Sequence, residues 1–299
     1  MTRFAQPLLP ALVALSILLA ACSAAGSSTA PIAHPAGDKL VLRMEFTGGF
    51  VGPAFALTSF PSFTLTGDGR VIVPGAQIDI FPGPALPAAN VRRLSEAGVQ
   101  AVLNEVARTK LFGASVQYRG AQNVVADASD TVFTLHADGN DVTVLVYALG
   151  TLDPAGSYPD ISAAELAAHR TLQALSERLG TLDAWLPATA WAEPAWHPYQ
   201  PDALRLLVRN TDADPPDESG IANQLIDWPD DSDPATFGAP NAFGEERCGV
   251  VSGEKAKVWY AALSTANQLT RFAKGDHRYQ VTVRLLLPDE ARECPKQAT

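Results

Sequence analysis

The sequence has few cysteines and histidines and lacks the short motifs of several common enzyme classes. Its 299 residues include 3 cysteines and 5 histidines. No G-x-S-x-G, G-x-G-x-x-G or P-loop pattern is present, and no H-x-H or H-E-x-x-H spacing occurs. We therefore expect no metal site and no bound cofactor. The histidines are His34, His136, His169, His197 and His277.

Basic side chains are also scarce. The chain has 22 Lys and Arg against 32 Asp and Glu, which gives a formal net charge of −10 at pH 7. Nucleic-acid-binding proteins need a basic footprint, so this balance argues against a nucleic-acid partner. It argues equally against adhesion of the folded part to anionic lipid.

The longest apolar run is too short to span a membrane. From Pro7 to Ala21 the chain is apolar except for Ser16, whereas a spanning helix needs roughly 20 apolar residues. Arg3 precedes this run, and small residues end it. A positive start, a short apolar core and small residues at its end are typical of a secretory signal peptide.

The end of this run, Leu19-Ala20-Ala21-Cys22, resembles the lipobox of bacterial lipoprotein precursors. In that family the signal peptide is cleaved before the cysteine, which then carries fatty acyl groups such as palmitate. The resemblance implies a signal peptide at 1–21, lipidation of Cys22, and export to the extracytoplasmic side of the bacterial cell envelope. Two acyl chains anchor a protein stably, because each buried methylene contributes about 0.8 kcal/mol. The alternative is an ordinary secretory peptide with a chance cysteine.

The other two cysteines, Cys248 and Cys294, form an even pair in a chain predicted to be exported. Export to an oxidising compartment favours a disulfide between them. The loop of roughly 46 residues that this bond closes corresponds to about 3 to 4 kcal/mol of stabilisation in the chain-entropy model. Two free thiols or a metal pair are the alternatives, but neither cysteine has a histidine or another cysteine at zinc-ligand spacing.

Hydrophobic periodicity predicts an α+β fold, in which an antiparallel sheet with hairpins packs on helices in two subdomains. Alternation predicts strands, and apolar stripes at helical spacing predict helices. A flexible tether at 22–38, rich in Ala, Ser, Gly and Pro, precedes the first subdomain. The predicted parts are the signal peptide (1–21), the tether (22–38), an N-terminal domain (39–186), a connector (187–200) and a C-terminal domain (201–299).

Within these domains, turn and capping residues predict where the elements begin and end. Asp138 and Gly139 predict a tight turn between two strands. Ser95 predicts the start of a helix at 96–111, and a capping box at Ser162 and Glu165 predicts the start of a second helix. Further strands are predicted at 39–46, 62–66, 70–75, 90–94, 203–209, 248–251 and 278–288, and a further helix at 253–270.

The segment VRLLLPDEAREC, residues 283–294, is similar to the tails of uncharacterised secreted bacterial proteins. This resemblance implies no particular activity.

Ser252-Gly253-Glu254-Lys255 resembles the S-x-x-K nucleophile motif of penicillin-binding proteins and serine β-lactamases. At the start of a predicted helix, Lys255 lies one turn beyond Ser252 and could activate its hydroxyl. The K-T-G and S-D-N motifs of that family are missing here. The other interpretation is that Ser252 simply caps the helix.

An acidic loop follows the first strand of the C-terminal domain. Asn210, Asp212 and Asp214 alternate as in a calcium-binding loop, but Pro215 and Ile221 occupy the positions where an EF-hand needs Gly and Glu. The later carboxylates of Asp227, Asp230, Asp231 and Asp233 could complete only a looser site. We therefore predict a solvated loop and no metal site.

Aromatic side chains crowd the connector: Trp185, Trp191, Trp196 and Tyr199. Such residues can form a platform for a glycan or peptide ligand. They can equally join two domains, since each buries about 150–250 Å². The second role is the commoner one.

The sequence as a whole predicts a lipid-anchored extracytoplasmic protein that acts as a non-catalytic binding or structural module. Besides the membrane, its partner would be an envelope protein, a peptide or a glycan. The alternative is an envelope serine hydrolase or penicillin-interacting enzyme that uses Ser252 and Lys255.

Overall fold

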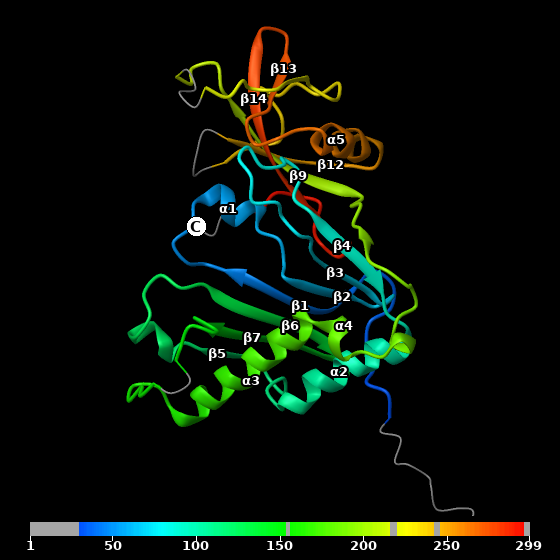
Figure 1. Ribbon diagram of the computed structural model, residues 1–299, viewed down its shortest axis with the longest axis vertical. Coiled ribbons are helices and arrows are strands. Elements are labelled where there is room, and N and C mark those ends of the chain that lie inside the picture. Colours follow the sequence, from blue (N-terminus) through cyan, green and yellow to red (C-terminus); the bar gives the residue numbers. More distant parts are fainter. Residues whose placement is uncertain (1–29, 154–155, 216–219, 242–245, 296–299) are drawn as a thin grey trace, which may run out of the picture. The chain divides into compact units, whose positions relative to one another are not determined.

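Two sheets organise the part of the chain that the computed structural model describes, residues 30–153, 156–215, 220–241 and 246–295. Both sheets belong to one compact unit, residues 32–299 (Figure 1). The fold is α+β and the sheets are largely antiparallel, as the sequence predicts. The predicted signal peptide, the lipobox and Cys22 lie outside the described residues. Among the residues that are described, no helix has the length and apolar character to cross a membrane.

The first sheet contains the hairpins predicted for the N-terminal domain. β5 runs parallel to β7, and the other neighbouring strands pair antiparallel. In the β6–β7 hairpin, Asp138 and Gly139 adopt positive φ angles of 50° and 71°, which confirms the predicted turn. The strand order is β5 (Val116–Tyr118), β7 (Asn140–Tyr147), β6 (Asp130–Ala137), β1 (Leu40–Thr47), β2 (Phe63–Thr66), β3 (Arg70–Pro74), β4 (Ala89–Arg93) and β8 (His197–Pro198).

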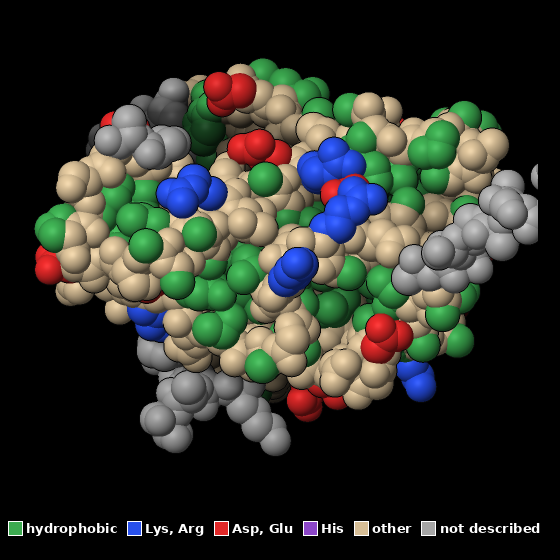
Figure 2. Space-filling model, turned by 90° about the horizontal axis from the view of Figure 1, so that it is seen from below, with side chains coloured by type: hydrophobic (Ala, Val, Ile, Leu, Met, Phe, Trp, Pro, Cys, Tyr) green, Lys and Arg blue, Asp and Glu red, His purple; other side chains and the backbone are tan. Residues whose placement is uncertain are grey.

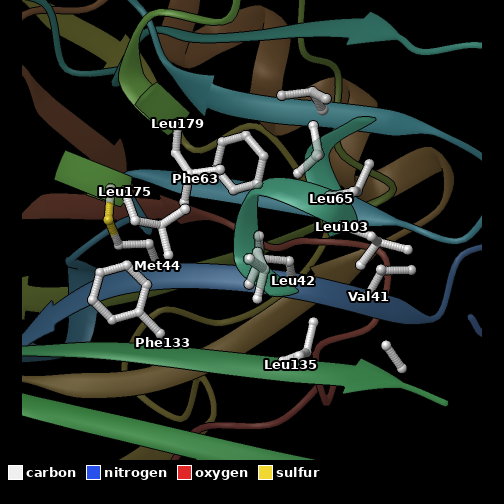
Figure 3. Packing of buried hydrophobic residues seen from close by; sticks show 14 of the residues in the cluster. Val41, Leu42, Met44, Phe63, Leu65, Leu103, Phe133, Leu135, Leu175 and Leu179 are labelled. Carbon is white, nitrogen blue, oxygen red and sulfur yellow. The ribbon is translucent and has the colours of Figure 1, made fainter. Parts of the chain in front are cut away.

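Two helices, α2 (Glu96–Thr109) and α3 (Ala163–Gly180), cover one face of this sheet (Figure 1). Their apolar stripes meet the side chains of the strands in a single buried core. Figure 3 shows this core, in which Leu103 of α2 and Leu175 and Leu179 of α3 lie over Leu42 and Phe63. The hydrophobic effect of this burial holds the helices on the sheet.

The helix starts follow the predicted caps, with one difference. Ser95 Oγ accepts a hydrogen bond from Gly98 N at 3.3 Å, and Ser162 Oγ accepts one from Glu165 N at 3.1 Å. The reciprocal half of the predicted capping box is replaced by another bond: Glu165 Oε1 accepts from the N–H of Gly120 at 2.6 Å, in the 3₁₀ helix η1 (Gly120–Asn123). The glutamate therefore connects α3 to a neighbouring loop.

The second sheet is formed by the C-terminal part of the chain. Helix α5 (Glu254–Ser264) packs on it through Trp259 and Leu263, which are fully buried. β10 runs parallel to β13, and the other pairs are antiparallel. The strand order is β10 (Leu225–Asp227), β13 (Arg271–Lys274), β14 (His277–Leu285), β9 (Ala203–Asn210), β12 (Arg247–Ser252) and β11 (Ala239–Pro240).

Helix α5 ends at Ser264, and the prediction that it continues to residue 270 is wrong. Asn267 and Thr270 form a turn in its place. Asn267 Oδ1 accepts from Leu269 N at 2.9 Å, and Thr270 Oγ1 accepts from Asn267 N at 2.8 Å. An asparagine that bonds its own neighbouring backbone competes with helix propagation.

The two sheets share a buried seam. Ile72 and Ala89 of the first sheet belong to the core of the second. The alternation of residues 39–46 is typical of a strand buried on one face only, yet Arg43 on its other face is 9% exposed because the C-terminal segment covers it. Arg43 Nη2 donates to both oxygens of Asp289, at 2.7 and 2.9 Å. The predicted N-terminal and C-terminal domains therefore pack closely inside one unit.

Residues 32–38, which the sequence assigns to the tether, contact the folded unit. Ile32 N donates to Gln100 Oε1 at 2.8 Å, and Ala33 N donates to Asp138 Oδ1 at 2.8 Å. His34 Nδ1 lies 2.8 Å from Pro35 O, and its Nε2 lies 3.3 Å from the Glu96 carboxylate. The compact unit thus begins before the predicted boundary.

The connector is also structured. Before it lies the short helix α4 (Leu182–Trp185), and within it are the 3₁₀ helix η2 (Ala188–Ala190) and strand β8. A side chain at Gly98 of α2 would place its Cβ 2.1 Å from Ala190 O, so only glycine allows η2 to approach α2 this closely. The helix α1 (Pro53–Thr58) lies between two predicted strands, in a stretch for which the sequence predicts no helix.

Candidate functional site

The S-x-x-K segment has a geometry that does not favour nucleophilic catalysis. Ser252 is the exposed last residue of β12, and no hydrogen bond joins it to Lys255 in the described structure. Lys255 Nζ donates to Asp231 Oδ1 at 2.6 Å, and this bond raises the pKa of the lysine. A general base needs the opposite shift. The interpretation of Ser252 as helix cap is also wrong, because Gly253 occupies the cap position with φ 61°.

In the acidic loop, the first carboxylates bind protein donors. Asp212 accepts from His277 Nδ1 at 2.6 Å and from Arg278 N at 2.8 Å, and these bonds lower its pKa to about 2. Asp214 forms a two-point pair with Arg209, at 2.7 and 2.8 Å. Both carboxylates are therefore already neutralised by cationic or N–H groups.

The second acidic run has a structural role around the buried indoles. Asp230 Oδ1 accepts from Trp228 Nε1, and its Oδ2 accepts from Trp259 Nε1, both at 3.0 Å. The two tryptophans meet edge to face, with ring centroids 4.7 Å apart. In the described part of the chain, no group of three or more His, Cys, Asp or Glu residues is arranged to hold a metal ion.

The connector tryptophans are half-buried and engaged with neighbouring side chains. The Arg92 guanidinium lies 3.9 Å from the ring centroid of Trp191, and Trp191 meets Trp196 edge to face at 5.6 Å. Trp196 Nε1 donates to Asp183 Oδ2 at 2.7 Å. In the same way, the guanidinium of Arg178 lies over the ring of Trp185, 4.3 Å from the ring centroid. All three tryptophans pack against the core of the first sheet.

Tyr199 does not join these tryptophans. It is 5% exposed and belongs to the core of the second sheet. Its hydroxyl donates to Leu286 O at 2.8 Å, and burial raises its pKa well above the ordinary value. The aromatic residues predicted as one group therefore contribute to two different cores.

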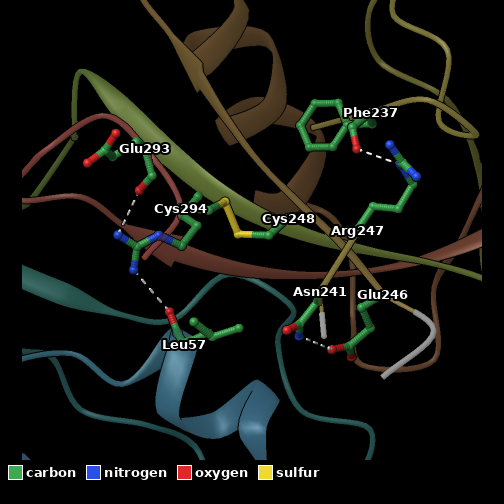
Figure 4. The surroundings of a disulfide bond; sticks show 9 residues. Leu57, Phe237, Asn241, Glu246, Arg247, Cys248, Glu293 and Cys294 are labelled. Atoms are coloured by element: carbon green, nitrogen blue, oxygen red, sulfur yellow. Dashed lines mark hydrogen bonds between the residues drawn. A yellow bond between two sulfur atoms is a disulfide. The ribbon is translucent and has the colours of Figure 1, made fainter. Parts of the chain in front are cut away.

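The predicted disulfide is present. Cys248 of β12 and Cys294 are bonded, with their Cα atoms 6.0 Å apart (Figure 4). Beside it, Arg205 donates to Glu293 O and to Leu57 O, each at 3.2 Å, and so links the C-terminal segment to α1. The bond fixes the C-terminal segment beside the second sheet and close to the seam.

A cavity of about 290 Å³ lies between α3 and the loop before it; we call it the α3 cavity. The helix lines it along one stripe, at positions three or four residues apart, and the loop lines it through Leu152 and Tyr158. Tyr158 closes the loop on itself, since its hydroxyl accepts from Asp153 N at 2.8 Å. The helical stripe consists of Leu166, His169, Arg170, Gln173, Ala174 and Glu177.

His169 is the unusual residue of this cavity. It is 5% exposed, and among the described residues neither ring nitrogen has a hydrogen-bond partner. Burial lowers the pKa of the imidazole, and the nearby Glu165 opposes this only in part. No role for His169 follows from the sequence alone, and its burial was not predicted. Its position three residues before Leu172, next to the apolar stripe, is the signal that predicts burial.

The face of the molecule formed by α2 and α3 is shown in Figure 2. Lys and Arg side chains gather near its middle, with apolar side chains around them. In a groove between the two helices, the Glu105 carboxylate bridges Arg108 and Arg178. Arg170 lines both this groove and the α3 cavity.

Comparison with protein-family models gives no match, and comparisons with curated proteins and with solved structures give none either.

Proposed function

We propose that this chain is an exported bacterial lipoprotein, held at the extracytoplasmic side of the cell envelope by lipid on Cys22. The lipobox resemblance is the observation on which this rests. The Cys248–Cys294 disulfide supports it, because structural disulfides persist in oxidising compartments outside the cytoplasm. The disulfide also uses both other cysteines, so Cys22 is the remaining one for acylation.

The folded unit then acts as a non-catalytic binding or structural module. The ion pair of Lys255 with Asp231, which raises the pKa of the lysine, supports this module over the serine hydrolase alternative. Envelope proteins, peptides and glycans are the partner classes that such a location offers. For the connector, the stacking of Arg92 on Trp191 supports a structural role, since that ring face is already covered.

Lipid attachment is tested by metabolic labelling of the full-length chain in a bacterial host with an alkyne-tagged palmitate. We expect label and membrane retention in the wild type and loss of both in Cys22→Ala. Cys248→Ala is the matched control, because it removes a cysteine and leaves the lipobox intact. Retention of label and membrane association in Cys22→Ala would show that the protein is anchored in another way.

The hydrolase alternative is tested separately with a fluorophosphonate probe and a fluorescent penicillin. We expect no covalent labelling of the wild type. Labelling that disappears in Ser252→Ala and persists in Ser264→Ala, a serine at the last position of α5, would replace the binding module with an enzyme.

A further inference from the structure

We propose that the groove between α2 and α3 is a docking surface for the anionic phospholipid headgroups of the membrane that holds the lipid anchor. This groove, which we call the arginine groove, has a volume of about 380 Å³, and its basic side chains are Arg108 of α2 and Arg170 and Arg178 of α3. The proposal rests on the lipid anchor proposed above, and it adds the face of the folded unit that meets the membrane.

The charges of the arginine groove are arranged with the acidic group below the basic ones. Glu105 is 12% exposed, whereas Arg108 and Arg178, which its carboxylate bridges, are 70% and 41% exposed. Arg170 is exposed and forms no hydrogen bond or ion pair with the described residues. The planar fork of N–H donors on a guanidinium matches the oxygens of a phosphate group. Three such groups therefore face outward around one carboxylate that is nearly buried.

The other carboxylates of the two helices do not line this groove. Glu96, Glu165 and Glu177 accept hydrogen bonds from Gln100 Nε2, from Gly120 N and from Gln173 Nε2, respectively. The arginine groove thus keeps an excess of positive charge although each helix also carries acidic residues.

The acidic net charge of the chain does not prevent a local contact with anionic lipid. At physiological ionic strength, screening confines interactions between exposed charges to about 8 Å. The acidic loop lies beside β13, at the end of the unit opposite to α2 and α3 (Figure 1). Its carboxylates are therefore too distant to repel headgroups at the arginine groove. The net charge of −10 still argues against adhesion through other parts of the unit.

The point at which the chain enters the folded unit brings α2 close to the proposed anchor. Ile32 lies against α2, since its N–H donates to Gln100 Oε1 and it lines a small cavity with Leu103 and Lys110. Only ten residues separate Ile32 from Cys22, and a fully extended chain of that length spans at most about 36 Å. The arginine groove lies on the other side of the same helix, and a helix with its side chains is about 10–12 Å across. A lipid on Cys22 would therefore keep this groove within reach of the membrane surface.

The test uses the full-length chain, isolated from a bacterial host and inserted into liposomes of phosphatidylcholine alone or of phosphatidylcholine and phosphatidylglycerol in equal amounts. Both kinds contain a trace of a phospholipid with a photoreactive diazirine on its headgroup. Flotation of the liposomes reports the anchor, and peptide mass spectrometry of the crosslinks reports which face meets the headgroups. Arg170→Glu reverses a charge in the groove, and Arg292→Glu makes the same change at an exposed position of the C-terminal segment.

We expect the wild type to float with both kinds of liposome, and crosslinks to residues 105–109 and 170–178 to form only where phosphatidylglycerol is present. Each basic side chain near an anionic surface strengthens binding about fivefold, so Arg170→Glu should reduce these crosslinks at least about fivefold. Arg292→Glu should leave them unchanged. High salt should abolish them in the wild type, because it screens the charges.

Flotation with both kinds of liposome without crosslinks in the groove would overturn the docking surface and leave the anchor in place, and an acidic peptide or protein would then be the occupant to seek. Crosslinks of equal yield in neutral liposomes, or crosslinks insensitive to Arg170→Glu, would also overturn it. Flotation with the anionic liposomes only, together with crosslinks in the groove, would support the docking surface and contradict the anchor. Failure to float with either kind would contradict both.

Discussion

Replacing Glu290 by Gln should destabilise the seam between the two sheets strongly. The Glu290 carboxylate accepts from Arg284 Nη1 and Nη2, both at 2.7 Å, and from Leu287 N at 2.8 Å. The side chains of Arg284 and Glu290 are 6% and 15% exposed, so water would do little to solvate a charge that loses its partner. Arg284 Nε also donates to Ser59 O at 2.6 Å, which ties β14 to the segment after α1.

The expected magnitude follows from the burial of this pair. Removing one partner of a buried ion pair costs about 3 to 5 kcal/mol, because the other charge stays buried without compensation. The amide oxygen of Gln can still accept one bond, so we expect a loss of about 3 kcal/mol in the free energy of unfolding at pH 7. For a chain of this size that corresponds to a fall of roughly 6 to 12 °C in melting temperature.

The loss should depend on pH in a defined direction. Burial opposes ionisation of Glu290, but the Arg284 guanidinium and the Leu287 N–H outweigh it and lower the pKa below the ordinary 4.5. A carboxylate whose pKa is lowered by folding stabilises the folded state fully at pH values above its unfolded-state pKa. This stabilisation is lost as the pH falls through its folded-state pKa. The difference between wild type and variant should therefore be largest near pH 7 and shrink below pH 4.5.

Calorimetry of the full-length chain between pH 3 and 8 measures both effects. Glu254→Gln is the matched control, since Glu254 pairs with Lys257 at the surface and is 85% exposed. It should change the melting temperature little at any pH. The reasoning would be refuted if Glu290→Gln were no worse than this control at pH 7, or if its deficit stayed constant down to pH 3.

Two further predictions concern the same region. Cys248→Ser with Cys294→Ser should lower the free energy of unfolding by about 3 to 4 kcal/mol in chemical denaturation, and an unchanged midpoint would show that the bond adds no stability. Glu45→Gln should raise the melting temperature at pH 7, because burial raises the pKa of Glu45 and its ionisation opposes folding, although the nearby Arg43 and Arg284 lower that pKa in part. This gain should vanish on acidification below pH 4.5, and a gain that persists there would contradict the electrostatic explanation.

Local features of the fold could be predicted from the sequence. The cap residues Ser95 and Ser162 each accept a hydrogen bond from a backbone N–H in the first turn of the helix they begin. The turn at Asp138 and Gly139 depends only on the backbone angles of these two residues. The hairpins and the apolar stripes of α2 and α3 also lie within short windows. Periodicity and capping chemistry are sufficient for such elements.

Features that depend on distant residues could not be predicted. Arg43 and Asp289 are 246 positions apart, and only their pairing explains why β1 is covered on both faces. The short strands β5 and β10 exist because each pairs in parallel with a partner strand, not because of their own composition. Three-residue strands have too little periodicity for a sequence pattern to show them.

The candidate site was missed for a related reason. A histidine on a helix reads as a surface residue when only its polarity is considered. His169 is buried beside loop residues 150–153 and 156–158, which lie next to that stripe of α3, and this part of the sequence has no periodic pattern. The four tryptophan and tyrosine positions of the connector were read as one group because they are close in sequence. Tyr199 nevertheless turns to the second core, while the tryptophans stay on the first.

The seam also determines how the halves of the chain depend on each other. Ile72 and Ala89 of the first sheet are buried by the second half, and removal of residues 201–299 would expose them to water. Arg205 and Arg284 of the second half in turn rely on Leu57 O and Ser59 O of the first, so the separated second half would lose partners for two buried cations. Because each half supplies what the other must bury or bond, we expect the two halves to unfold together in one transition. A substitution in the C-terminal segment, such as Glu290→Gln, should then lower the stability of both sheets together.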